Sequence, residues 1–338
     1  MRSVLIAGAA GFIGSYLVDR YLAADWRVVG VDNLLTGNER NLDRARESDR
    51  FTLLRRDIAM ENDDLAAAVE ASGAAPELIL HFASPASPID YFEFPVETMA
   101  ANSLGTLHCL QAVRRWGGRF LYASTSESYG DPLVHPQRED YWGNVNPVGP
   151  RSCYDESKRF GEALTMAFVR SADVNARIIR IFNTYGPRMR PNDGRVVSNF
   201  IVQALRGEPL TIYGDGSQTR SFCYVDDLVE GIVRCAASEK TRGRVVNLGN
   251  PEEHTMAELA TLASELAGVP LSIERQPARE DDPARRRPDI GLARELLDWE
   301  PRISCTDGLR RTVDAFRSAD GLTSSHSPLC RSGDRTAP

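Results

Sequence analysis

The chain is poor in lysine and lacks the cysteine patterns of metal and disulfide sites. Only two of its 40 basic residues, Lys158 and Lys240, are lysines. Its six cysteines contain no Cys-x-x-Cys pair, and the five histidines do not gather near them. This spacing argues against a zinc site or a disulfide framework. We therefore expect no metal site and a reducing, cytoplasmic location.

Long hydrophobic runs and excess positive charge are also missing. No apolar stretch approaches the roughly 20 residues that a membrane span requires. An apolar segment follows Met1 almost at once, so we expect no signal peptide. The formal net charge of −7 argues against nucleic acid or an anionic membrane as a partner. An anionic ligand would therefore have to be bound by local hydrogen-bond donors.

The sequence does contain an alternation of apolar strands and amphipathic helices. We predict helices at 12–24, 94–116 and 154–170, and strands at 3–7, 28–31, 51–54, 78–82, 120–123 and 176–182. Such an alternation predicts an α/β fold with a doubly wound parallel sheet. We place this domain at 1–185 and a smaller mixed region at 186–318, with the chain recrossing to the sheet near 225–250. The polar segment 319–338 is predicted to be a disordered tail.

A glycine-rich turn joins the first strand to the first helix. It reads Gly-Ala-Ala-Gly-Phe-Ile-Gly over positions 8–14. Glycines at such a junction let the backbone approach a pyrophosphate, and the helix N-terminus supplies free N–H groups. The turn therefore predicts a Rossmann-type dinucleotide site that contains Gly8, Gly11, Phe12, Ile13 and Gly14.

An acidic residue, Asp32, ends the second predicted strand. A carboxylate at this place can accept both hydroxyls of an adenosine ribose and would repel a 2′-phosphate. Because no arginine follows it directly, the sequence favours NAD over NADP. We assign further cofactor contacts to Asn33, Thr36, Gly37, Asp57, Ile58, Phe82, Ala83, Ser84 and Thr184.

Tyr154 and Lys158 are four residues apart, so a helix places them on one face. A tyrosine is a poor base at neutral pH unless positive charge stabilises its phenolate. The pair could take a proton from a sugar hydroxyl while hydride passes to NAD. The fifth strand runs into Thr125, Ser126 and Glu127, which would emerge where open α/β sheets bind ligands.

These motifs together resemble the extended short-chain dehydrogenases/reductases, and within them the UDP-glucuronate decarboxylases. The similarity runs from about residue 1 to residue 301. Its most specific segments are 82–88 (FASPASP), 124–132 (STSESYGDP), 135–150, 183–203 (NTYGPRMRPNDGRVVSNFIVQ) and 213–224 (YGDGSQTRSFCY). The resemblance implies that NAD oxidises the sugar at C4, that the acid then loses CO2, and that the C4 ketone is reduced again.

The resemblance also implies a role for individual residues. Tyr154 would be the base with Lys158 as its partner, and Thr125 would bind the C4 oxygen. Glu127 would handle a proton near C5, and Arg286 would close over the substrate. The nucleotide sugar would be lined by Asn183, Asn199, Tyr213 and Arg220. Two departures from many relatives are Arg190, where histidine is expected, and the alanines at 100–101.

Several alternatives stay open from the sequence. A 4,6-dehydratase usually has Asp between the Thr and the Glu, whereas this chain has Ser126, a much weaker acid. A 4-epimerase generally lacks the glutamate, and a non-catalytic NAD(H)-sensing regulator would need no base. The nucleotide could be UDP or TDP. We also expect a homodimer built from the helices near 94–116 and 154–170, whose apolar residues include Leu104, Leu107, Leu110, Leu164, Phe168 and Val169.

Overall fold

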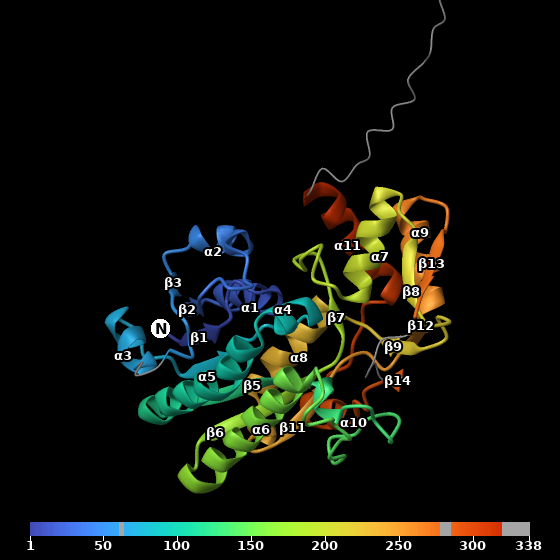
Figure 1. Cartoon of the computed structure of the whole chain (residues 1–338). Helices are drawn as coiled ribbons and strands as arrows, with labels where there is room; N and C mark the ends of the chain where they lie inside the picture. The colour runs from blue at the N-terminus through green and yellow to red at the C-terminus, as the bar shows by residue number, and fades with distance from the viewer. Residues whose placement is uncertain (61–63, 278–284, 320–338) are drawn as a thin grey trace, which may run out of the picture.

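The computed structural model describes residues 1–60, 64–277 and 285–319. Its centre is a parallel sheet of seven strands (Figure 1). In spatial order the strands are β3 (Phe51–Arg55), β2 (Arg27–Asp32), β1 (Ser3–Ala7), β4 (Leu78–His81), β5 (Arg119–Thr125), β6 (Asn175–Ile181) and β11 (Val245–Leu248). The predicted doubly wound parallel sheet is confirmed. The strand order reverses between β1 and β4, which is where open sheets of this kind bind ligands.

Helices cover both faces of the sheet. One face carries α1 (Phe12–Ala23) and α8 (Val225–Ala237), and the other carries α3 (Leu65–Ala71), α5 (Pro95–Trp116) and α6 (Ser152–Ala172). The sheet strands are almost continuously apolar because both of their faces are buried. In Figure 1, α5 and α6 run side by side along one edge of the molecule.

The chain leaves the sheet after β6 and returns to it. Short parallel strands β7 (Thr184–Tyr185) and β10 (Cys223–Tyr224) pair with each other, and α8 and β11 then rejoin the sheet. The domain boundary at 185 stays a prediction. Ala319 ends the last helix, and the rest of the predicted tail lies outside the described residues.

The smaller region packs against the carboxyl ends of the strands (Figure 1). It contains α7 (Val196–Arg206), β8 (Leu210–Tyr213), β9 (Thr219–Ser221), β12 (Glu253–Thr255), α9 (Met256–Ala267), β13 (Ile273–Gln276), β14 (Arg285–Arg286), α10 (Gly291–Leu297) and α11 (Cys305–Ala319). Strand β9 pairs with both β12 and β14. Short segments connect the larger elements: η1 (Glu39–Leu42), α2 (Asp43–Arg46), α4 (Pro88–Glu93), η2 (Ser126–Tyr129) and η3 (Glu239–Thr241).

One close contact fixes the spacing between α6 and β5. A Cβ atom added to Gly161 on α6 would lie 2.2 Å from the hydroxyl oxygen of Tyr122 on β5. Only glycine lets the helix approach the strand this closely. The contact matters because α6 carries Tyr154 and β5 ends at Thr125.

Among the described residues, no helix has both the length and the apolar character that crossing a membrane would require.

Candidate active site

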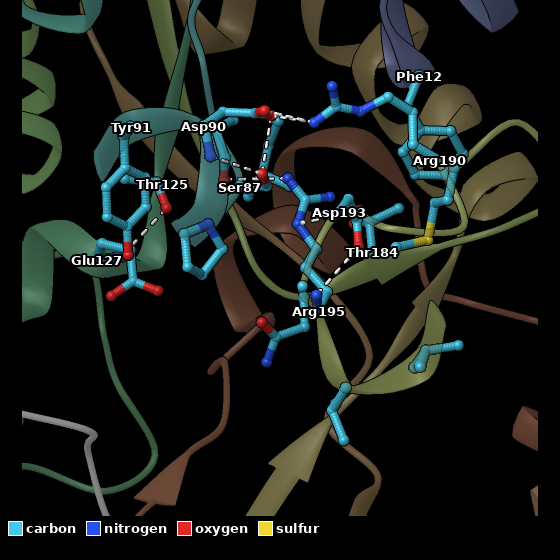
Figure 2. A pocket seen from close by; sticks show the side chains of 18 of the residues that line it. Phe12, Ser87, Asp90, Tyr91, Thr125, Glu127, Thr184, Arg190, Asp193 and Arg195 are labelled. Carbon is cyan, nitrogen blue, oxygen red and sulfur yellow. Dashed lines mark hydrogen bonds and ion pairs between the residues drawn. The ribbon is translucent and has the colours of Figure 1, made fainter. Parts of the chain in front are cut away.

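A cavity of about 560 Å³ lies at the carboxyl ends of the strands, between the sheet and the smaller region. Figure 2 shows Tyr91, Thr125 and Glu127 grouped on one side of it. The cavity brings together most of the predicted site, namely Gly8, Gly11, Phe12, Ile13, Gly14, Thr36, Phe82, Ser84, Thr125, Ser126, Glu127, Tyr154, Lys158, Asn183, Thr184, Asn199, Tyr213, Arg220 and Arg286.

The glycine turn forms one wall, which we call the cofactor wall (residues 8–14 with Asp32). A Cβ atom at Gly14 would lie 1.9 Å from the carbonyl oxygen of Gly8, so the turn can close only around glycine. The Asp32 carboxylate accepts hydrogen bonds from the N–H groups of Ala10 and Leu34, each at 2.8 Å. Backbone donors at a helix N-terminus and a carboxylate at the end of β2 fit the diphosphate and ribose of NAD.

Some predicted cofactor contacts do not line this cavity. Asp32 and Gly37 lie just behind the glycine turn, where a Cβ at Gly37 would meet the Asp32 carboxylate at 2.9 Å. The Asn33 amide donates to the Asp57 carboxylate at 3.0 Å. Ile58 and Ala83 pack in the core beneath the sheet. Contacts of these residues with the cofactor remain predictions.

Tyr154 is buried at the bottom of the cavity, and its ring stacks on Tyr91 at 5.1 Å between centroids. Burial raises the pKa of the Tyr154 phenol to about 12, while hydrogen bonding to Thr125 and the charge of Arg195 act in the opposite direction. The protein alone therefore leaves Tyr154 protonated at neutral pH. Positive charge brought by a bound nicotinamide would favour the phenolate.

Lys158 lies one helical turn from Tyr154, as the spacing predicts. Its ammonium group donates to the carbonyl of Ala123 at 2.8 Å and lies 5.8 Å from the centroid of the Tyr154 ring. Burial lowers the pKa of Lys158 to about 7, against the charge of Glu162. A lysine with this pKa can lose or gain a proton at neutral pH, which an arginine cannot do.

The opposite wall is charged, and we call Glu127, Arg151 and Arg286 the substrate wall. Both terminal nitrogens of Arg286 donate to the Glu127 carboxylate, one of them at 2.8 Å, and Arg151 donates to it at 2.6 Å. Burial raises the pKa of Glu127, but Arg286 and Arg151 more than offset this effect and lower it to about 2. Glu127 is therefore ionised at neutral pH.

Asp155 adds a second carboxylate behind the substrate wall. It is buried, one of its oxygens has no hydrogen-bond partner, and the other lies 4.0 Å from Arg151. Burial, followed by the negative charge of Glu127, raises the pKa of Asp155 to about 7. Arg151 therefore lies between a carboxylate that is ionised at neutral pH and one that is half protonated.

Sequence reasoning missed Arg151 and a second ion pair of the cavity. Arg190 donates to both carboxylate oxygens of Asp90, and the Ser87 hydroxyl donates to the same carboxylate (Figure 2). Arg195 donates to the carbonyl of Ala86 at 3.0 Å. Arg151 directly precedes α6, three residues before Tyr154, and this position is the signal that could have identified it. The Asp90–Arg190 pair spans 100 residues, and no local pattern indicates it.

The remaining predicted substrate residues come from the smaller region. Asn199 lies on α7, Tyr213 ends β8, and Arg220 lies in the middle of β9, where it is buried. Asn183 follows β6. Ser126 begins η2 and is buried between Thr125 and Glu127. In the part of the chain that the structure describes, no group of three or more His, Cys, Asp or Glu side chains could hold a metal ion.

This fold and site define a class of protein. Residues 4–249 match the model of the NAD dependent epimerase/dehydratase family, and the chain belongs to that family. The cofactor of the family is NAD, in agreement with the cofactor wall.

The chain is also similar to curated proteins that have more specific names than the family. The chain is 50% identical over 315 residues to UDP-glucuronic acid decarboxylase 1 of Arabidopsis thaliana, an alignment that covers 93% of this chain and 70% of that protein. It is 49% identical to UDP-glucuronic acid decarboxylase 1 of Danio rerio, covering 93% of this chain and 72% of that protein.

The chain is also similar to a solved structure over most of its length. The UDP-glucuronic acid 4-epimerase of Bacillus cereus, in complex with UDP-glucuronic acid and NAD, has a TM-score of 0.82 and 29% identity. The comparison covers 93% of this chain and 99% of that one.

Proposed function

We propose that the protein is an enzyme that converts UDP-glucuronate to a UDP-pentose and CO2. One observation carries the proposal: Glu127, paired with Arg286 and Arg151, shares a cavity with the Tyr154 phenol and the Thr125 hydroxyl. Two arginines close to the Tyr154 base suit a sugar that carries a carboxylate, because guanidinium groups bind carboxylates. The names of the curated relatives support the same substrate.

The first step removes a proton from the C4 hydroxyl. NAD, held by the glycine turn of the cofactor wall, would supply the redox chemistry at C4, and because it would be used and regenerated in the same cycle there would be no net oxidation. Tyr154 takes the hydroxyl proton, Thr125 holds the oxygen, and Lys158 supports the phenolate with its positive charge. These three side chains are buried, and they project from the end of β5 and from a helix that is packed closely against it.

The second step breaks the bond between C5 and the carboxyl carbon. Its electron pair moves into an enolate whose negative charge rests on the C4 oxygen, where Tyr154 and Thr125 stabilise it. A proton must then return to C5. Because its pKa is about 2, Glu127 is ionised and cannot supply this proton; its carboxylate would instead accept a hydrogen bond from a water molecule that protonates C5, while Tyr154 keeps the hydroxyl proton for the return to the C4 oxygen.

Ser126 separates this reaction from dehydration. A 4,6-dehydratase needs an acid that protonates the departing C6 hydroxyl, and a serine hydroxyl is far too weak an acid for this task. Carbon dioxide leaves without being protonated. The residue between Thr125 and Glu127 therefore favours loss of CO2 over loss of water.

The test is to incubate the purified protein with UDP-glucuronate, TDP-glucuronate and the corresponding NDP-glucoses and to identify the products by mass. We expect CO2 and a UDP-pentose from UDP-glucuronate, and no 4-keto-6-deoxy sugar from either NDP-glucose. Efficient formation of that sugar would show that the protein is a dehydratase. Formation of an isomeric UDP-hexuronate without CO2 would identify it as a 4-epimerase, the activity in the name of the solved relative. Binding of NAD without turnover of any substrate would favour a regulator.

We further propose a homodimer through α5 and α6. Leu104 on α5 is 38% exposed and Phe160 on α6 is 51% exposed, whereas Leu110 is fully buried against the sheet. Outward apolar side chains on two adjacent helices suit a four-helix contact with a second copy. Light scattering should give the mass of a dimer at micromolar concentration, and Phe160→Glu should lower it to that of a monomer. A monomeric wild-type protein would contradict this proposal.

A further inference from the structure

Arg286 reaches the cavity from a short strand. Strand β14 has two residues, pairs with β9, and follows a segment outside the described residues. The Arg286 side chain is nevertheless only 5% exposed, and its two terminal nitrogens both contact Glu127. A two-residue strand has too few hydrogen bonds to fix a side chain this well, so other contacts must hold it.

Gln137 supplies those contacts. This residue is fully buried. Its backbone N–H donates to the carbonyl of Arg287 at 2.9 Å, and its own carbonyl accepts from the N–H of Asp289 at 2.8 Å. Its side-chain oxygen accepts from the N–H of Arg287 at 2.8 Å. Three hydrogen bonds from one residue therefore bind the chain directly after Arg286.

Gln137 is itself held by Val134 and by Asn247 of β11, and Asn247 also contacts η2, which carries Glu127. Its side-chain N–H donates to the carbonyl of Val134 at 2.8 Å. The amide of Asn247 donates to the Gln137 carbonyl at 3.1 Å, and the hydroxyl of Tyr129, two residues after Glu127, donates to Asn247 at 2.8 Å. A chain of hydrogen bonds through Asn247 on β11 thus connects Gln137, which binds the segment after Arg286, to the segment that carries Glu127.

We propose that Gln137 is a positioning residue that sets the Arg286 guanidinium against Glu127 and so adjusts the site for a substrate carboxylate. This inference rests on the proposed function. Without the side-chain oxygen of Gln137, the N–H of Arg287 loses its partner, and β14 can shift relative to η2. A misplacement of about 1 Å can lower a rate by up to about 100-fold.

The test is a double-mutant cycle in the full chain loaded with NAD. Gln137→Met removes both amide functions at similar length, Gln137→Glu keeps the acceptor for Arg287, and Arg286→Ala removes the positioned group. We expect Gln137→Met to lower kcat for UDP-glucuronate about 10- to 100-fold, and Gln137→Glu to recover part of the loss. In the Arg286→Ala background, Gln137→Met should lower kcat no further.

Two controls separate positioning from general stability. Thr241→Val removes a buried hydroxyl that donates to Cys235 and does not line the cavity, so it should lower the melting temperature and leave kcat unchanged. If Gln137→Met does not fold, Gln137→Asn is used instead, because its shorter side chain moves the amide away from Arg287 and Val134.

Two outcomes of the kcat measurements would overturn the inference. One is an equal loss of kcat from the Gln137 change in both backgrounds, and the other is a folded Gln137→Met protein with wild-type kcat. The four proteins of the cycle are also titrated with UDP-glucuronate. If the wild type binds this ligand without releasing CO2, the proposed function fails, while additive effects on affinity would separately reject the coupling between Gln137 and Arg286.

Discussion

The two walls of the cavity are built in different ways. The cofactor wall uses backbone N–H groups and one carboxylate, all within the first 32 residues. The substrate wall uses full charges, and its Glu127–Arg286 pair joins residues 159 positions apart. A turn between neighbouring residues is enough to build a dinucleotide site. A site for a charged sugar needs charged side chains from distant parts of the chain, which only the packing of the whole fold brings together. We therefore expect changes to the two walls to differ in kind: changes to the substrate wall should affect turnover and stability, and changes to the cofactor wall should affect occupancy.

The largest effect is expected from Tyr154→Phe. Loss of the proton acceptor should lower kcat by about 10²- to 10⁴-fold. The phenylalanine ring can still stack on Tyr91, so the NAD content of the purified protein should change little. Tyr185→Phe is the matched control, because the Tyr185 hydroxyl donates to the carbonyl of Cys305 and not into the cavity. Loss of bound NAD together with turnover would mean that Tyr154 has a structural role.

Glu127→Gln should affect stability more than any change on the cofactor wall. It leaves the buried guanidinium of Arg286 and the partly buried one of Arg151 without their carboxylate, which costs about 3–5 kcal/mol in the free energy of unfolding at pH 7. Urea unfolding measures this loss, and adding Arg286→Met should recover part of it.

The loss should depend on pH. The pKa of Glu127 is lowered from 4.5 to about 2, so its stabilising effect is present above pH 4.5 and disappears as the pH falls toward 2. Unfolding curves of the wild type and of Glu127→Gln should therefore converge near pH 2. A constant difference across this range would contradict the account of the ion pair.

On the cofactor wall, Asp32→Asn should weaken NAD binding by about 10- to 100-fold, the value of a hydrogen bond to a charged group. The preference for NAD over NADP should also fall, because the negative charge that repels a 2′-phosphate is gone. Asp57→Asn serves for comparison and should have a smaller effect, since the Asp57 carboxylate accepts from Asn33 whereas that of Asp32 accepts from Ala10 in the glycine turn. Equal affinity of the wild type for NADP would refute the role given to Asp32.

The smallest effect is expected from Asp155→Asn. The pKa of Asp155 is raised from 3.8 to about 7, so its contribution to stability is complete below pH 3.8 and is lost as the pH rises through 7. The asparagine imitates the protonated acid. Because asparagine does not ionise, the variant should lose about 2 kcal/mol less stability than the wild type between pH 5 and pH 8. An unchanged pH profile in the variant would show that Asp155 does not titrate in this range.

The sequence predicted the two walls unequally well. The strand at 3–7 matches β1 at both ends, and the helices carrying the glycine turn and Tyr154 were placed within two residues. These elements have strong local periodicity. Helices α9, α10 and α11 were not predicted, although Thr255 and Glu258 form a capping box at the start of α9.

Arg286 shows why the substrate wall was harder to predict. In the sequence it stands in a run of three arginines, which alone suggests a solvated basic segment. In the structure the first two arginines of the run form strand β14, so Arg285 is exposed to solvent while Arg286 is 4% exposed. Alternation along a strand could have indicated this arrangement, but a two-residue strand is too short to be recognised. Only the family resemblance identified Arg286, and Gln137 and Arg151 had no signal of comparable strength.

The contact of Gly161 with Tyr122 has a consequence for redesign of this enzyme. A methyl group at position 161 would push α6 away from β5, and Tyr154 and Lys158 would move together relative to Thr125. Loops of the smaller region can be exchanged to accept another sugar without touching this contact. A library that randomises the substrate loops while keeping Gly161 and Tyr122 fixed should therefore retain the redox half of the reaction in most of its folded members.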